Sequence, residues 1–210
     1  MHRKRSDIRK REIVEASLEI IKEYGIQKLS LKRIANRIGI SEQAIYRHFD
    51  SKLEILRAII EYFNTELKKT VHAALPAENV TAQIHALTSA HMTFINTHPA
   101  VASVIFSEEM FQNEPELAEI VRQALMKRLS QITQLIQQGQ QNGEFDPRLD
   151  PSVIARMLLG SLRLNVVIWR LNGYQPNLLQ EGQEVVTTIL NLIKTEEVPV
   201  PSSGKIIKHT

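Results

Sequence analysis

Two short apolar segments on either side of a glycine constrain the fold of this chain more than any other feature. Residues 31–38 and 42–48 each provide about two helical turns, and helices of that length are marginal alone, so packing has to stabilise them. Ala35 is small where the second helix would cross the first, and Gly39 stands at the turn, where glycine tolerates a positive φ angle. This spacing predicts a helix-turn-helix pair, although helical corners with a glycine also occur outside DNA-binding proteins.

Positive charge is concentrated at the start of the chain. The first 52 residues carry 13 Lys and Arg against 7 Asp and Glu, whereas the rest carry 13 against 16. A basic end suggests contact with a polyanion, and charge alone is equally compatible with a solvated arm. Acidic residues among the bases of the first segment disfavour a basic amphipathic helix on a membrane surface. The arm residues that are candidates for minor-groove or DNA-backbone contacts are Arg3, Lys4, Arg5, Arg9, Lys10 and Arg11.

The rest of the chain has the apolar periodicity of helices. The other expected helices cover residues 6–24, capped by Ser6, and residues 52–74, 80–97, 101–111, 115–141, 151–171 and 178–193. We therefore predict an all-α protein. Residues 1–52 form a three-helix, helix-turn-helix DNA-binding domain with a basic N-terminal arm, and residues 53–194 form a larger helical domain for effector binding and dimerisation. Residues 195–210, rich in proline, serine and charge, are expected to be a disordered tail.

Composition excludes several classes of site. The chain has no cysteine, which excludes disulfides, thiolate zinc sites and iron–sulfur clusters. No apolar run reaches about 18 residues, and the basic start lacks the apolar run of a signal peptide, so we expect a cytoplasmic protein without a membrane partner. His85, His91 and His98 are not spaced like a helical metal pair, so no metal is expected. Nucleotide-binding and hydrolase motifs are missing, which disfavours an enzyme and leaves no cofactor expected.

The second helix of the pair carries side chains suited to reading base pairs. Gln43 can pair with adenine through two hydrogen bonds, Arg47 can contact guanine or a phosphate, and Ala44 can meet a thymine methyl group. Ser41 and His48 lie on the same exposed face of the expected helix. These residue types on a helix of this size favour insertion into the major groove of double-stranded DNA.

The segment from Leu29 to Leu56 closely resembles the N-terminal domain of the TetR family of transcriptional repressors. The matching features are Ser30, Ile34-Ala35, Gly39-Ile40-Ser41, Ile45-Tyr46, His48-Phe49 and Ser51-Lys52. The resemblance implies phosphate contacts by Ser30, Tyr46, His48 and Lys52, base contacts by Ser41, Gln43 and Ala44, and either kind by Arg33. Ser30 and Ser51 are also compatible with a purely structural role as N-caps. Glu42 departs from the Lys or Arg often found at its position, which puts a backbone contact there in doubt.

The resemblance further implies a homodimer, and the last two long helices are the candidate interface. Residues 151–171 are apolar nearly all round, which is typical of a helix that is buried on both sides. The interface candidates are Met157, Ser161, Val185 and Ile189. A purely intramolecular core is the alternative.

A ligand-released repressor would also enclose an effector between residues 80 and 180. The candidate pocket residues are His91, Phe94, Phe106, Met110, Arg163 and Trp169, with Phe111, Asn96 and Asn165 in addition. Arg163 stands in an apolar run, and a buried guanidinium needs an anionic partner, either a ligand or Glu108 or Glu109. We therefore expect a small organic effector that is hydrophobic or anionic.

Overall fold

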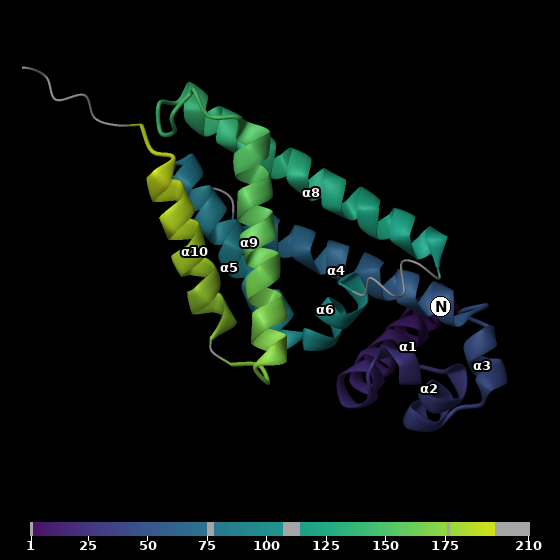
Figure 1. Ribbon diagram of the computed structural model, residues 1–210. Coiled ribbons are helices and arrows are strands. Elements are labelled where there is room, and N and C mark those ends of the chain that lie inside the picture. Colours follow the sequence, from purple (N-terminus) through teal and green to yellow (C-terminus); the bar gives the residue numbers. More distant parts are fainter. Residues whose placement is uncertain (1, 75–77, 107–113, 176, 196–210) are drawn as a thin grey trace, which may run out of the picture.

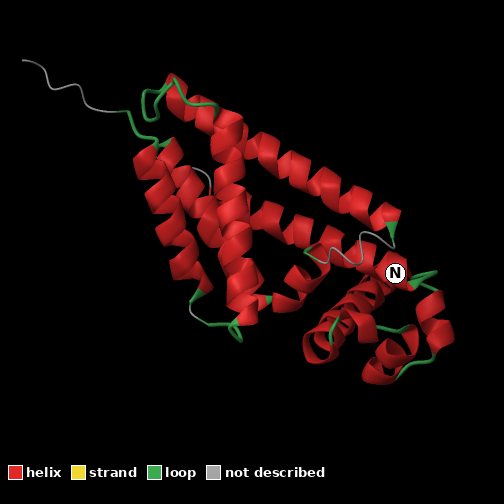
Figure 2. Ribbon diagram, viewed as in Figure 1, coloured by secondary structure: helices red, strands yellow, loops and turns green. Residues whose placement is uncertain are grey.

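The computed structural model describes residues 2–74, 78–106, 114–175 and 177–195, and almost all of the regular structure there is helical (Figures 1 and 2). The elements are α1 (His2–Tyr24), the 3-10 helix η1 (Ile26–Lys28), α2 (Leu31–Ile38), α3 (Glu42–Tyr46), α4 (Lys52–Ala74), α5 (Val80–Thr97), α6 (Pro99–Ile105), α8 (Pro115–Gln141), α9 (Pro151–Leu171) and α10 (Leu178–Leu192). One isolated antiparallel bridge joins Phe145 and Lys194. The predicted all-α class is confirmed. The tail from residue 196 and the end of the expected 101–111 helix lie outside the described residues.

The start of the chain differs from the prediction. Helix α1 begins at His2, so the expected basic arm is the first turns of a helix, and Ser6 lies inside that helix instead of capping it. Within α1 the side chains of Arg9 and Glu12 form an ion pair at 2.6 Å. Intrahelical pairs of this kind favour continuation of the helix towards the N-terminus.

Local signals fix the helix-turn-helix pair as expected. The Ser30 hydroxyl accepts from the backbone N–H of Arg33 at 3.3 Å, and the Ser41 hydroxyl accepts from that of Ala44 at 3.2 Å. These bonds satisfy N–H groups that a helix leaves free at its start. Gly39 has a φ angle of 69°, in the left-handed region where a Cβ would be strained. Helix α3 ends at Tyr46, two residues earlier than expected.

The first apolar core joins α1, α2 and α3 to α4 and α6. Its members from α6 include Val101 and Val104, both fully buried, and Leu117 of α8 adds to it. Helix α6 packs directly on α1, so the C-terminal helices touch the N-terminal ones. Because this core extends beyond residue 52, the proposed division there is not a boundary between separate cores, and the division stays a prediction.

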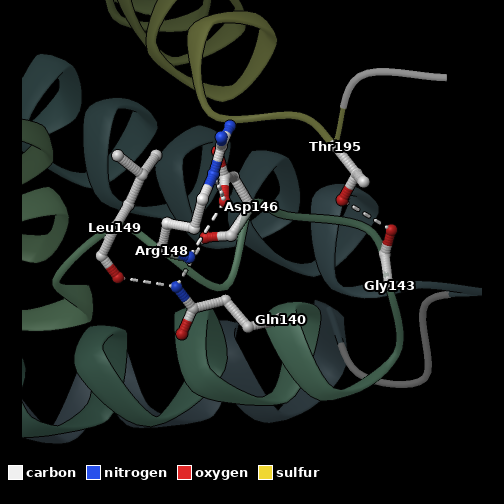
Figure 3. A network of polar contacts seen from close by, with 6 residues as sticks. All are labelled: Gln140, Gly143, Asp146, Arg148, Leu149 and Thr195. Atoms are coloured by element: carbon white, nitrogen blue, oxygen red, sulfur yellow. Dashed lines mark hydrogen bonds and ion pairs between the residues drawn. The ribbon is translucent and has the colours of Figure 1, made fainter. Parts of the chain in front are cut away.

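The second core lies among α5, α8, α9 and α10, towards the end of α4 that is away from α1–α3 (Figure 1). Here the connection from α8 to α9 is held by polar contacts. The amide of Gln140 donates to the carbonyl oxygens of Asp146 and Leu149 at 2.9 and 2.8 Å, and the Thr195 hydroxyl donates to the carbonyl of Gly143 at 2.9 Å (Figure 3). The segment after α10 is thereby fastened to the end of α8.

Helix α9 is long and apolar enough to cross a membrane by length and composition alone. In the fold it packs against both α8 and α10, and Leu158, Val166 and Trp169 are buried in the second core. This packing buries one side of α9 in the second core.

Candidate nucleic-acid interface

Helix α3 has one buried side and one free side. Ile45 is fully buried against the first core, whereas Tyr46 is 51% exposed. Gln43 and Arg47 are exposed, and Ala44 is half-buried. The side chains that were expected to read base pairs therefore lie on the surface of a helix that is anchored by its opposite side. This is the geometry that insertion into a groove requires.

The phosphate-contact candidates flank that surface at helix starts. Ser30 precedes α2, and Lys52 is the first residue of α4, where Ser51 caps the helix by accepting from the N–H of Glu54 at 3.2 Å. Free backbone N–H groups and the helix dipole favour anions at such positions. Ser30 and Lys52 are both half-buried. For Ser30 the N-cap and phosphate roles are compatible, because its hydroxyl oxygen and the free N–H groups lie at the same end of α2.

Two of the expected DNA-contacting side chains are already in contact with α1. The guanidinium of Arg33 lies 5.0 Å from the ring centre of Tyr24, and Nδ1 of His48 lies 3.3 Å from the Ser6 hydroxyl. Cation–π and hydrogen-bond contacts of this kind restrict rotamers. Contacts with α1 therefore restrict the orientations of the Arg33 and His48 side chains.

Arg37 holds α2 on α1 by a bidentate ion pair. Its two terminal nitrogens lie 2.9 and 2.6 Å from the carboxylate oxygens of Glu23. The hydrogen bond from Arg37 lowers the pKa of the Glu23 carboxyl. This pair could not be predicted from the sequence, because its residues are 14 positions apart on different helices and no local pattern connects them.

A cleft of about 380 Å³ opens where α1, the end of α3 and α4 meet. Its lining combines basic, acidic and aromatic side chains, among them Lys10, Arg57, Glu61 and Tyr62. Lys10 lies over the ring of Phe49 at 5.5 Å. The cleft was not foreseen from the sequence, since its walls come from three separate segments.

The effector-pocket candidates do not form one group. The rings of His91 and Phe94 pack on Phe63 of α4, with centroid distances of 5.8 and 5.2 Å. Trp169 belongs to the second core, and its ring centre lies 4.9 Å from that of the exposed Tyr174. Met110 lies outside the described residues, as do Phe111, Glu108 and Glu109.

The expectation that Arg163 is buried is wrong. Its side chain is exposed, and its guanidinium lies 5.1 Å from the ring centre of Phe106. Asn96 is exposed as well, whereas Asn165 is half-buried and its amide nitrogen has no hydrogen-bond partner within the described part of the chain. Arg163 is therefore not a buried guanidinium, and its exposed charge also lies over an aromatic face.

The four dimer-interface candidates differ in solvent exposure. Met157 is 47% exposed, Ser161 and Val185 are half-buried, and Ile189 is buried in the second core of a single chain. Ile189 is thus already covered by its own subunit, and α9 contributes more free apolar surface than α10.

Comparison with known proteins is consistent with this geometry. Residues 13–59 match the family described as "Bacterial regulatory proteins, tetR family", and residues 49–192 match the "YsiA-like protein, C-terminal region". The nucleoid occlusion factor SlmA of Vibrio atlanticus (strain LGP32) is 26% identical over 178 residues, which are 82% of this chain and 90% of that protein.

Two further similarities concern proteins named for fatty acids. The fatty acid metabolism regulator protein of Bacillus subtilis (strain 168) is 22% identical over 184 residues, 86% of this chain and 93% of that protein. The structure of the transcriptional regulator FadR from Bacillus subtilis in complex with stearoyl-CoA superposes with a TM-score of 0.76 at 21% identity, covering 87% of this chain and 98% of that one. Together the two matched regions span nearly all of the described helices, and the chain belongs to the TetR family of DNA-binding transcriptional regulators, with a C-terminal region of the YsiA-like type and no enzymatic role.

Proposed function

We propose that the protein is a cytoplasmic repressor that binds a palindromic operator as a homodimer and is released by a lipid-like effector. The observation that carries the proposal is the outward face of α3, where Gln43, Tyr46 and Arg47 are exposed while Ile45 is buried. One such helix contacts few base pairs, so specific recognition favours two helices related by a two-fold axis. Two α3 helices about 34–36 Å apart would enter successive major grooves.

An apolar stripe on α9 supports the dimer. Val153, Met157, Leu164 and Leu171 follow helical spacing and are 41%, 47%, 57% and 81% exposed. Gly160 lies within the same stripe, and a Cβ built there meets no atom within 4 Å. An apolar stripe of this length on a soluble regulator is unfavourable in water, and pairing with the same stripe of a second chain removes it.

The effector proposal is supported by the relatives and by the composition of the C-terminal helices. One relative is named for fatty acid metabolism, and a structural neighbour was solved with stearoyl-CoA. Helices α4, α5 and α8 pack on one another with aromatic side chains between them. An effector that binds more tightly to one spacing of the two helix-turn-helix pairs shifts the dimer population towards that spacing. The free energy of this shift cannot exceed the difference between the effector's binding free energies for the two states.

This function is tested by selecting bound operators from a random pool of duplexes and then measuring how variants of the protein bind them. Gln43→Ala should relax base preference at its position by roughly 1–3 kcal/mol, because a paired contact to one base is lost. Lys52→Ala should weaken all duplexes alike and reduce the slope of log affinity against log salt by about 0.9. Lys127→Ala, an exposed lysine on α8, is the control for loss of one positive charge. Unchanged specificity in Gln43→Ala would contradict the assignment of Gln43 as a base reader.

A further inference from the structure

The backbone of His48 is fixed by its neighbours, whereas the position of its ring is not. His48 follows α3, and its N–H donates to the carbonyl of Ile45 at 2.8 Å, as does the N–H of Phe49 at 3.0 Å. Ile45 and Phe49 are both buried in the first core. These neighbours and backbone hydrogen bonds hold the Cα atom of His48 in place, so rotation of the side chain is the freedom that remains.

Packing alone does not restrain that rotation, because the imidazole borders an open space. His48 is half-buried and belongs to the lining of the cleft of about 380 Å³ between α1, the end of α3 and α4. A side chain in a filled core is confined by the atoms around it, whereas a side chain beside a cleft keeps alternative rotamers. Holding this ring ready for a phosphate therefore needs a specific partner, since immobilising a free rotamer on binding costs free energy.

That partner is Ser6 of α1. Its hydroxyl oxygen lies 3.3 Å from Nδ1 of His48, although the two residues are 42 positions apart in the sequence. A second contact holds the same side of α1 against the end of α3. Lys10, one turn after Ser6, lies over the ring of Phe49 with Nζ 5.5 Å from the ring centre. Two residues one turn apart on α1 thus contact two consecutive residues after α3.

The two ring nitrogens of an imidazole take different roles when one of them is occupied. A neutral ring carries one proton, which makes one nitrogen a donor and the other an acceptor. A serine hydroxyl that donates to Nδ1 leaves the proton on Nε2, where it can be donated to an anionic oxygen. A neutral ring that instead donates from Nδ1 presents a bare lone pair at Nε2, which a phosphate repels. Donation by Ser6 is therefore the arrangement that prepares Nε2 of His48 for a phosphate.

We propose that Ser6 is a positioning residue for DNA binding: its hydroxyl donates to Nδ1 of His48 and fixes the rotamer and the tautomer in which Nε2–H of His48 donates to a DNA phosphate. The proposal rests on the outward face of α3 as the DNA-contacting surface proposed above. Ser6 lies inside α1, where serine favours the helix less than alanine does. The hydroxyl, and not helix propensity, is thus what this residue provides.

Fluorescence anisotropy with the selected operator and with a random duplex tests the proposal on the full chain. His48→Ala should weaken both duplexes by about tenfold or more and Ser6→Ala by about threefold or more, and the ratio of the two affinities should not change, because phosphate contacts carry no base preference. Ser6→Thr keeps a hydroxyl and should stay within about twofold of the wild type. Ser130→Ala, the same substitution at an exposed serine of α8, is the matched control and should change neither affinity.

A double-mutant cycle shows whether Ser6 acts through His48. In a His48→Ala background, Ser6→Ala should change the affinity by less than about twofold. A full additional loss in that background overturns the proposal, because Ser6 would then act without the imidazole.

Nitrogen NMR spectra of the ring at about pH 8.5 report the tautomer independently of DNA. The signals of His48 are identified by their loss in His48→Gln. The wild type should carry the proton on Nε2, and Ser6→Ala should increase the share of rings that carry it on Nδ1. A wild-type ring with its proton on Nδ1 contradicts donation by Ser6.

The melting temperature separates a positioning role from a structural one. Ser6→Ala should melt close to the wild-type temperature, because its gain in helix propensity offsets the loss of one half-buried hydrogen bond. Weaker DNA binding together with a melting temperature lowered by more than about 4 °C makes Ser6 a structural residue and overturns the proposal. If His48→Ala binds DNA as the wild type does, the positioning role fails and the operator-binding function stands, whereas a wild type that selects no operator contradicts the function itself.

Discussion

The helix-turn-helix pair and the C-terminal helices are held by interactions of different range. In the pair, each helix start is stabilised by a hydrogen bond that spans three residues. The Ser30 hydroxyl accepts from the N–H of Arg33, and the Ser41 hydroxyl accepts from the N–H of Ala44. In the C-terminal part the decisive contacts join distant segments. The carboxylate of Glu144 accepts from the N–H groups of Val80 and Thr81 at 3.0 Å each, across more than 60 residues.

The free surfaces of the two regions differ just as clearly. The outer face of α3 is polar and stands over a fully buried Ile45, whereas the outer face of α9 is apolar, with Leu164 57% exposed. A polar face on an anchored helix suits a hydrated partner such as a duplex, and an apolar face suits a second copy of itself. One chain therefore carries a polar face, which we propose for DNA, and an apolar face, which we propose for assembly.

The largest expected effect tests the second surface. Leu164→Glu places a charge in the centre of the α9 stripe, so two chains should no longer pair at micromolar concentration, and operator affinity should fall by at least 100-fold with the loss of the second α3. Light scattering after size exclusion measures the mass, and fluorescence anisotropy measures operator binding.

Leu125→Glu provides the matched control for that change. Leu125 is also an exposed apolar residue, 44% exposed, but it lies on α8 outside the stripe. This variant should remain dimeric and bind operator as the wild type does. A dimeric Leu164→Glu protein would show that the α9 face has another use.

Much of the architecture follows from local sequence. Helix ends are marked by local signals: a serine before an apolar helical segment, a glycine at a turn, and a proline at the first helical position. Because these signals act within a few residues, the bounds of α2, α4, α8 and α9 agree with the expectation. Other bounds differ from the expectation: α1 begins at His2, α3 ends at Tyr46 and α6 begins at Pro99. Nothing local marks the start of α1 before Ser6, and the ion pair of Arg9 with Glu12 stabilises the helix after that residue.

The second predicted effect concerns packing that no local pattern reveals. Gly139→Ala should destabilise the fold by about 1–3 kcal/mol, because a Cβ there overlaps the ring of the fully buried Phe145. Gln138→Ala, an exposed neighbour on the same helix, should change the free energy of unfolding by less than about 0.5 kcal/mol. Urea denaturation measures both, and equal stability of the two variants would show that the ring moves aside without cost.

The effector-pocket candidates show why residue roles were harder to foresee than helices. Arg163 stands in an apolar run and was expected to be buried, yet it is exposed, while Arg128 stands between polar and apolar residues and is half-buried. Periodicity indicates that a helix is amphipathic, but which neighbour covers each face depends on tertiary packing. Ile189 illustrates the same point, since its own subunit buries it.

The smallest expected effect concerns Ser41, which caps α3 and is also a candidate for contact with DNA. Ser41→Ala should cost about 1 kcal/mol of stability through loss of the cap on α3, and Ser41→Asp should keep the cap while adding a negative charge where DNA is expected. Ser41→Asp should therefore unfold like the wild type and bind all duplexes more weakly, with a shallower salt dependence. Thermal unfolding and anisotropy at several salt concentrations distinguish the two variants. If Ser41→Asp bound operator as tightly as wild type, the start of α3 would lie away from the DNA, and the polar face would have to meet the duplex through its later residues, Tyr46 and Arg47.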